Sequence, residues 1–167
     1  MTRAKGPTYR VAFRRRAEKK TNYSKRLALV KSGLPRMVVR KSNRYVLAQF
    51  VEFRPEGDRT ICTIHGKLLA KRFNWPSKRN SWSAYLVGLY AGKEAAKKGV
   101  KEFVLDIGMR TPSNGSILFA ALQGAVDAGL TTKYDEKKVP SSKLANPPEA
   151  IKAQFNEIKA KILSGEG

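Results

Sequence analysis

The residues best suited to chemistry are cationic and lie close together near the N-terminus. The run Arg14–Arg16 is followed by further Lys and Arg side chains as far as residue 26, with Tyr9, Phe13 and Tyr23 among them. Arginine suits bidentate phosphate contacts and stacking on bases, and aromatic rings can serve as platforms for unpaired bases. A solvated surface or a localisation signal would also be basic, but the interleaved aromatic residues favour nucleic acid. The residues of this segment that we expect to contact it are Arg10, Arg14, Arg15, Arg16, Lys19, Lys20, Tyr23, Lys25 and Arg26.

A second polar cluster lies at the tip of a predicted hairpin. A polar tip is commonly only a turn, and Asn43 is suited to turn geometry. Three cations, an amide and an aromatic ring within six residues nevertheless exceed what a turn needs. A rigid hairpin can present Arg and Asn side chains to a loop or groove edge of RNA. The residues assigned to this cluster are Arg36, Arg40, Lys41, Ser42, Asn43, Arg44 and Tyr45.

Two loops before predicted helices are further candidates. Lys78 and Arg79 precede a helix N-terminus, where free backbone amides favour phosphate, although solvent exposure would explain them equally well. The segment 108–116 looks like a phosphate cradle between a buried strand and a helix. It lacks the Lys-Ser/Thr pair after its last glycine, which argues against nucleotide hydrolysis. Arg110 and Ser116 are still placed to meet an RNA phosphate.

The sequence offers little support for catalysis. Cys62 and His65 are three residues apart on a predicted strand, so they should point to opposite faces. A metal-dependent nuclease needs clustered carboxylates, but Glu94, Asp106 and Asp127 are scattered, and the first predicted strand carries Arg rather than Asp. The single cysteine leaves no internal disulfide and no thiolate zinc cluster. We therefore expect no enzyme, no cofactor and no small-molecule substrate.

The distribution of charge supports a nucleic-acid partner. The chain of 167 residues carries 34 Lys and Arg against 13 Asp and Glu, a net charge of +21. Two thirds of that excess lies in residues 1–44, which predicts a basic arm on a nearly neutral body. A polyanion is the expected partner, either nucleic acid or an anionic membrane. No apolar run approaches the roughly 20 residues of a membrane span, and the N-terminus shows no apolar signal segment, so we expect nucleic acid and a cytoplasmic setting.

The elements that must position these residues follow from the sequence pattern. Residues 1–20 hold few large apolar side chains, so we expect them to lack stable structure until they bind a partner. A short helix capped by Thr21 or Asn22 should follow and end at Gly33. Its apolar side chains should form one stripe for docking, with the cations on the remaining surface. This stripe consists of Tyr23, Leu27 and Val30.

The body should be an α/β layered domain. Three strand signals joined by short connections predict an antiparallel meander, and a strand between two later helices predicts a parallel crossover. Small residues in the first long helix should allow it to approach the sheet closely, and a final amphipathic helix from near Pro148 should carry Ile151, Phe155, Ile158 and Ile162 on one stripe. The predicted strands are 36–41, 45–53, 59–65 and 102–107, and the predicted helices are 67–73, 81–98, 115–128 and one beginning near 148. The predicted organisation is an arm with its helix over 1–33, a core over 34–132 and a C-terminal extension over 133–167.

With these segments in order, the chain resembles the archaeal form of the ribosomal large-subunit protein eighteen family, which binds 5S ribosomal RNA. The resemblance covers about residues 6 to 132, and its most distinctive stretch is Leu34-Pro35-Arg36-Met37-Val38-Val39-Arg40-Lys41-Ser42-Asn43. Other matching segments are Arg14–Arg16, Thr21–Tyr23, Arg26-Leu27, Ala48-Gln49, Ser83–Leu86, Val104–Gly108, Phe119–Ala121, Gly124-Ala125 and Asp127–Leu130. The chain departs from the family pattern at Ile117-Leu118, where a basic residue is common, and at Thr132–Tyr134.

The resemblance implies a three-layer α/β/α core with a mixed sheet of ribonuclease-H-like topology and no catalysis. It also implies that the protein seats 5S rRNA in the central protuberance, beside 23S rRNA and neighbouring large-subunit proteins. The arm, the hairpin and the loop before the second core helix should touch RNA. An RNA-processing enzyme of ribonuclease-H-like fold is the alternative from another class, but it would need a converging acidic metal site. A free RNA chaperone is compatible with the composition.

Overall fold

The computed structural model describes residues 6–76 and 78–165 and is organised around one mixed sheet. The first three strands pair antiparallel in sequence order, and the fourth pairs parallel with the first, which gives the order β3-β2-β1-β4. The strands are β1 Arg36–Lys41, β2 Val46–Glu52, β3 Arg59–His65 and β4 Val104–Asp106. The predicted meander and parallel crossover are therefore confirmed. An isolated parallel bridge between Glu102 and Thr131 extends the pairing beyond β4.

Polar side chains cap several of the helices at their starts, as the sequence pattern predicted for the helix after residue 22. Asn22 accepts from the backbone of Lys25, and Asn80 accepts from that of Ser83, as expected of N-caps. The helices are α1 Arg14–Ala17, α2 Tyr23–Lys31, α3 Gly66–Phe73, α4 Ser81–Lys97, α5 Ile117–Asp127, α6 Ser141–Ala145 and α7 Glu149–Ser164, with a 3₁₀ turn at Glu136–Lys138. The sequence pattern did not predict α1, α6 or the 3₁₀ turn. Within the described ranges, no helix combines the length and the apolar character that crossing a membrane requires.

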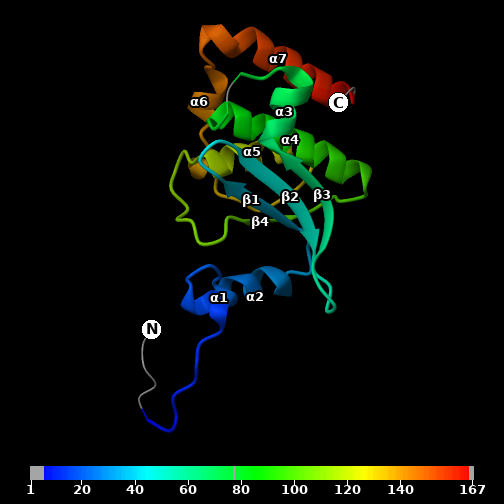
Figure 1. Cartoon of the computed structure of the whole chain (residues 1–167). Helices are drawn as coiled ribbons and strands as arrows, with labels where there is room; N and C mark the ends of the chain where they lie inside the picture. Colours follow the sequence, from blue (N-terminus) through cyan, green and yellow to red (C-terminus); the bar gives the residue numbers. More distant parts are fainter. Residues whose placement is uncertain (1–5, 77, 166–167) are drawn as a thin grey trace.

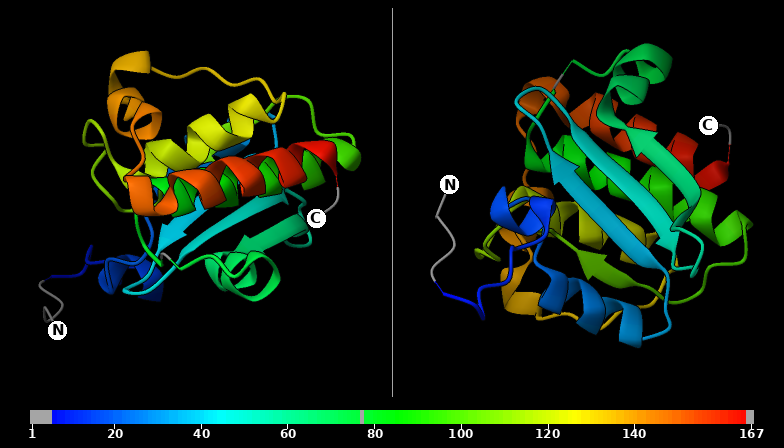
Figure 2. Two further views of the ribbon diagram at one scale, coloured as in Figure 1. Left: turned by 90° about the horizontal axis from the view of Figure 1, so that it is seen from above. Right: turned by 60° about the horizontal axis from the view of Figure 1, so that its bottom comes forward.

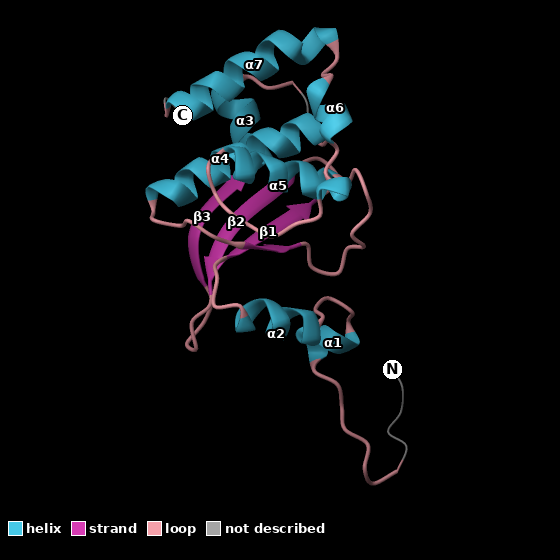
Figure 3. Cartoon of the chain, turned by 180° about the vertical axis from the view of Figure 1, so that it is seen from behind, coloured by secondary structure: helices cyan, strands magenta, loops and turns pink. Residues whose placement is uncertain are grey.

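The two faces of the sheet carry different side chains because residues alternate along β1. Met37 and Val39 are fully buried on the face covered by α4 and α5. Arg36, Val38 and Arg40 occupy the other face. Helices α1 and α2 lie on that side, below the sheet in Figure 1. Figure 3 shows the same layers from behind, with the sheet between the arm helices and α4–α5. The predicted three-layer α/β/α arrangement is confirmed.

Helices α4 and α5 touch through their backbones. A Cβ atom added at Gly88 would lie 1.9 Å from the carbonyl oxygen of Ala121, and one added at Gly124 would lie 2.1 Å from that of Tyr85. Only glycine permits this distance between two helices. The small residues of α4 were expected to allow close approach to the sheet, but Gly88 instead serves the contact with α5.

The C-terminal helix packs on the body of its own chain. Phe155 lies 5.6 Å from the ring of Tyr85 and 6.3 Å from that of Trp75, measured between ring centroids. The predicted apolar stripe is confirmed, since Phe155, Ile158 and Ile162 are buried. Seen from above in Figure 2, α7 lies over α4 on the side away from the sheet. This helix therefore adds an outer layer to the helical face.

The predicted docking stripe of α2 is wrong. Tyr23 and Leu27 are exposed, Leu27 by 56%. The helix is turned so that Arg26 and Leu29 line the space facing the sheet. On this side the Arg26–Asp58 ion pair joins α2 to the loop between β2 and β3.

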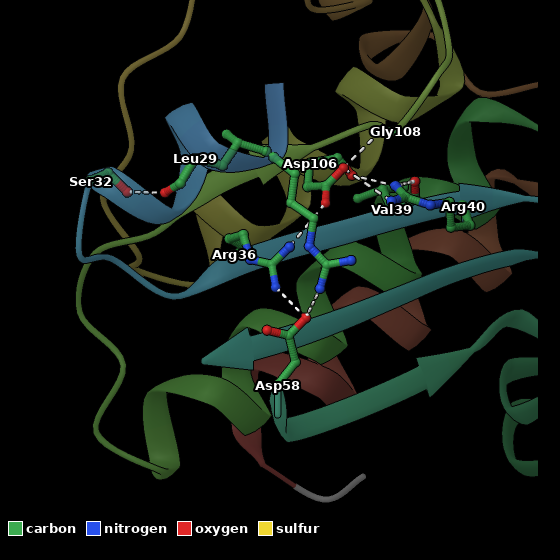
Figure 4. Close-up of polar contacts among 9 residues, drawn as sticks. Leu29, Ser32, Arg36, Val39, Arg40, Asp58, Asp106 and Gly108 are labelled. Atoms are coloured by element: carbon green, nitrogen blue, oxygen red, sulfur yellow. Dashed lines mark hydrogen bonds and ion pairs between the residues drawn. The ribbon is translucent and has the colours of Figure 1, made fainter. Parts of the chain in front are cut away.

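Two aspartates and a buried arginine connect the arm to the sheet (Figure 4). Asp58, in the loop between β2 and β3, pairs with Arg26 of α2 and also accepts from Arg36 Nη2 at 2.6 Å. The other terminal nitrogen of Arg36 lies 3.5 Å from Asp106 at the end of β4. Only 4% of the Arg36 side chain is exposed. The same guanidinium thus joins β1, β4 and the loop that holds α2.

Replacing Gly88 by alanine tests the backbone contact between α4 and α5. The added methyl group meets a carbonyl oxygen, so the helices must separate. We expect Gly88→Ala to lower the free energy of unfolding by about 2 kcal/mol or more, since overpacking outweighs the gain in helix propensity. Urea denaturation measures the change. The exposed substitution Ala96→Ser on the same helix is the control, with an expected effect within about 0.5 kcal/mol. Equal effects of the two substitutions would contradict the contact.

Replacing Asp58 by asparagine tests the tether of the arm. It removes the partner of Arg26 and one of the two carboxylates of buried Arg36. We expect a loss of about 2 kcal/mol of stability, below the usual cost of breaking a buried pair because Asp106 still faces Arg36. Amide exchange in α2 should accelerate more than exchange in α4. Glu56→Gln in the same exposed loop is the control. Unchanged exchange in α2 would show that Asp58 does not hold the arm.

Candidate nucleic-acid interface

A groove of about 970 Å³ separates the arm helices from the open face of the sheet. Residues of α2 and the preceding turn form one wall. Val38, Gln49 and Thr60 of the sheet form the floor, and the loop after β4 closes one end. The cationic residues that line it are Arg15, Lys19, Lys20, Lys25, Arg26, Arg36, Arg40 and Arg110. The structure therefore brings together residues that the sequence pattern had placed in three separate clusters.

The charge of the groove is strongly unbalanced. Asp58 and Asp106 are the acidic residues of the described lining, and both are already engaged by arginines. Among the described residues, Lys19, Lys25 and Arg110 have no carboxylate within 4 Å. A concave surface lined by one sign of charge concentrates the electric field. The groove suits a polyanion.

Arg36 differs from the other predicted contact residues. Its guanidinium is held between Asp58 and Asp106, and its Nε is buried without a hydrogen-bond partner. A side chain that is 4% exposed offers RNA almost no surface. We therefore assign Arg36 to the support of the groove rather than to direct contact.

Part of the arm faces away from the groove. Tyr23 lies edge-to-face against Phe13, with ring centroids 5.7 Å apart, and Phe13 is 74% exposed. The predicted contact residues of the arm that do not line the groove are Arg10, Arg14, Arg16 and Tyr23. The arm thus presents cations and aromatic rings on its outer side as well. The predicted lack of stable structure over 1–20 falls partly outside the described residues, and α1 itself has no buried residue.

The hairpin tip forms a compact turn beyond β1. The Ser42 hydroxyl donates to the carbonyl of Tyr45 and accepts from its amide, each at 3.0 Å. Arg79 donates to the Ser42 carbonyl at 3.4 Å, so the loop before α4 touches the tip. This turn leaves Asn43 and Arg44 exposed. Lys41 is half-buried, and Lys78 is exposed in the adjacent loop.

Ser116 has a structural task. Its hydroxyl caps α5 by accepting from the amide of Leu118 at 3.4 Å. The two departures from the family pattern also lie in packed positions. Ile117 packs against the core, and the Tyr134 hydroxyl lies 3.3 Å from the amide oxygen of Gln123.

Arg40 is the cation at the end of the groove near the loop after β4. It donates to the Asp106 carbonyl at 2.6 Å and to the Asp106 carboxylate at 3.0 Å. Sequence reasoning identified Arg40 but missed Asp58, Asp106 and Gly108, which position the groove. The sequence does indicate that Arg36 and Arg40 lie on one face of β1, because they are four residues apart and side chains alternate along a strand.

The groups considered for catalysis do not form a site. Cys62 is buried and donates to the Ala91 carbonyl, whereas His65 is exposed and caps α3, as their spacing predicted. Burial raises the pKa of the Cys62 thiol, which makes it a poor nucleophile. Tyr85 donates to Asp127, and burial is the main cause of its raised pKa. In the part of the chain described here, no three His, Cys, Asp or Glu residues are grouped to hold a metal ion.

Comparison with known proteins identifies relatives over most of the chain. The Large ribosomal subunit protein uL18 of Aeropyrum pernix is 47% identical over 161 residues, which cover 92% of this chain and 75% of the relative. The protein of the same name from Caldivirga maquilingensis is 43% identical over 173 aligned residues, which cover 95% and 84%. Residues 7–103 match the family described as ribosomal large subunit proteins 60S L5 and 50S L18. By this match and these identities, the chain belongs to that family of ribosomal large-subunit proteins.

Proposed function

We propose that this protein is a non-catalytic structural constituent of the large subunit of the cytoplasmic ribosome, and that its RNA partner is 5S rRNA. The observation that carries the proposal is the groove between the arm and the sheet, with its excess of cations over two engaged aspartates. The relatives bear the name of a large-subunit ribosomal protein. The family resemblance supplies 5S rRNA as the specific partner, with 23S rRNA and neighbouring proteins alongside.

The groove and the hairpin tip supply two different kinds of contact. The groove has exposed lysines along its wall, which suit contacts to a phosphate backbone. The tip is a rigid turn that presents Asn43 and Arg44 outside the groove. An amide and a guanidinium can hydrogen-bond the edges of unpaired bases. We assign affinity mainly to the groove and specificity mainly to the tip.

The acidic network argues against the enzymatic alternative. A ribonuclease-H-like nuclease would need carboxylates free to bind metal ions. Here Asp106 lies 3.0 Å from Arg40 and faces Arg36, so cations of β1 occupy the place where metal ions would be needed. Glu94 pairs with Lys97, and Asp127 is bound by Tyr85 and Gln123. These carboxylates stabilise the protein itself.

The groove proposal predicts a specific salt dependence. We expect the triple variant Lys19→Gln, Lys25→Gln, Arg110→Gln to bind 5S RNA more weakly and to reduce the slope of log affinity against log salt by about 2. Binding releases fewer counterions from the RNA for each phosphate contact that the variant has lost. Filter binding over a range of salt concentrations measures the slope.

A matched control removes the same charge elsewhere. Lys71, Lys143 and Lys152 are exposed and do not line the groove. Changing these three to glutamine should leave the slope nearly unchanged. If the control triple lowers affinity and slope as much as the groove triple, binding depends on total charge and the groove is not the site.

The choice of RNA is tested by competition. Labelled 5S RNA bound to the full chain should be displaced by unlabelled 5S RNA at far lower concentration than by an unrelated structured RNA of similar length. We expect a specificity ratio of at least about tenfold at physiological salt, since non-specific binding rests on phosphates alone. Equal competition by the two RNAs would remove 5S RNA as the specific partner while leaving the groove as an RNA site.

A further inference from the structure

Arg40 is bound to its own protein along one edge. Its Nη1 donates to the carbonyls of Val39 at 2.9 Å and Asp106 at 2.6 Å, and its Nη2 donates to the Asp106 carboxylate at 3.0 Å. Three of the five N–H groups of a guanidinium are thereby used. The end-on edge, where arginine commonly grips a phosphate with both terminal nitrogens, is turned toward Asp106 (Figure 4).

One flat face of the same guanidinium is covered by a glycine. A Cβ atom added at Gly108 would lie 3.0 Å from the central carbon of the Arg40 guanidinium, 3.2 Å from Nη2 and 3.3 Å from Nε. An atom that is closest to the central carbon and slightly farther from the nitrogens lies above the plane, not at its rim. Gly108 also donates its amide to the Asp106 carboxylate at 2.8 Å. The same aspartate therefore fixes both the arginine and the glycine that supports it.

The exposed surface of Arg40 is consequently its other face and the side that bears Nε. The side chain is 41% exposed and lines the groove. Its charge is partly balanced by Asp106, which weakens its attraction for phosphate but not the stacking of its planar face. Arginine planes are established platforms for unpaired bases.

We propose that Arg40 is a stacking platform for an unpaired base of the bound RNA, and that Gly108 is the residue that positions it. This inference rests on the proposed RNA-binding function and specifies what one end of the groove recognises. A side chain at Gly108 would push the guanidinium off its support. The backbone there has a φ of +67°, which also favours glycine.

Substitutions of Arg40 distinguish stacking from a charge contact. A stacked base is expected to contribute about tenfold or more to 5S RNA affinity. Arg40→Ala and Arg40→Lys should therefore both weaken filter binding by about tenfold or more, because lysine restores the charge but not the plane. The slope of log affinity against log salt should change by less than about half a unit for Arg40→Ala. Wild-type affinity for Arg40→Lys, or a slope reduced by about one unit for Arg40→Ala, would identify a phosphate contact and overturn the proposal.

Gly108→Ala tests the positioning role. It should weaken 5S RNA binding several-fold, whereas Gly99→Ala should leave affinity unchanged. Gly99 also has a positive φ, +84°, but its Cβ would meet nothing within 4 Å. In the Arg40→Ala background, Gly108→Ala should have no further effect, since the two act as one unit. If the two substitutions each lower 5S RNA affinity by the same factor whether alone or combined, Gly108 does not act through Arg40.

The two proposals can fail separately. If Arg40→Ala leaves 5S RNA affinity unchanged while the groove triple Lys19→Gln, Lys25→Gln, Arg110→Gln weakens it, the stacking platform is wrong and the groove stands. If neither variant changes affinity, the groove itself is wrong. Circular dichroism and urea denaturation of each variant establish that it is folded under the binding conditions. Arg40→Lys serves as the milder replacement if Arg40→Ala proves unstable.

Discussion

The connection between the arm and the sheet depends on the two carboxylates of Asp58 and Asp106 around the guanidinium of Arg36. Burying an arginine is costly unless the charge is paired, and here two carboxylates from different segments supply the pairing. The loop between β2 and β3 is thereby fixed relative to the end of β4. Asp58 then holds Arg26 of the arm, and Asp106 holds Arg40 at the other end of the groove. Two acidic residues thus position three of the arginines that line the groove.

This arrangement explains why the two faces of the sheet differ so strongly. The face toward α4 and α5 is apolar, and these two helices, whose backbones touch each other, cover it. On the opposite face, α2 is joined to the loop between β2 and β3 by the Arg26–Asp58 pair, and a groove remains between this helix and the sheet. Nucleic-acid binding requires that opening, because phosphates must reach the cations without removing a packed layer of side chains. The apolar core lies on one face of the sheet, and the surface that we propose binds RNA lies on the other.

The sequence predicted the elements of the body well because their signals are local. The strand signals of the meander, the cap at Asn22 and the apolar stripe around Phe155 each lie within one short segment. The orientation of α2 was wrong because an apolar stripe was assumed to dock, whereas the Arg26–Asp58 pair joins residues 32 positions apart. Arg36 was taken as a contact residue for a similar reason, since its type suggests RNA while its burial depends on two distant aspartates. The sequence shows that Gly108 lies in a loop, but its position over Arg40 follows only from the tertiary structure.

The backbone contact of α4 with α5 also bears on how the protein can adapt to a partner. At Gly88 and Gly124 backbone meets backbone, so α4 and α5 cannot roll or slide at these two points without breaking the contact. With α7 packed over α4, the helical side forms a continuous packed layer. The segment around Gly33, at the junction between α2 and the sheet, lacks such a contact, since a Cβ atom added there would meet nothing within 4 Å. We therefore expect the entropy cost of any induced fit to fall on the arm, with the sheet offering the partner a preformed surface.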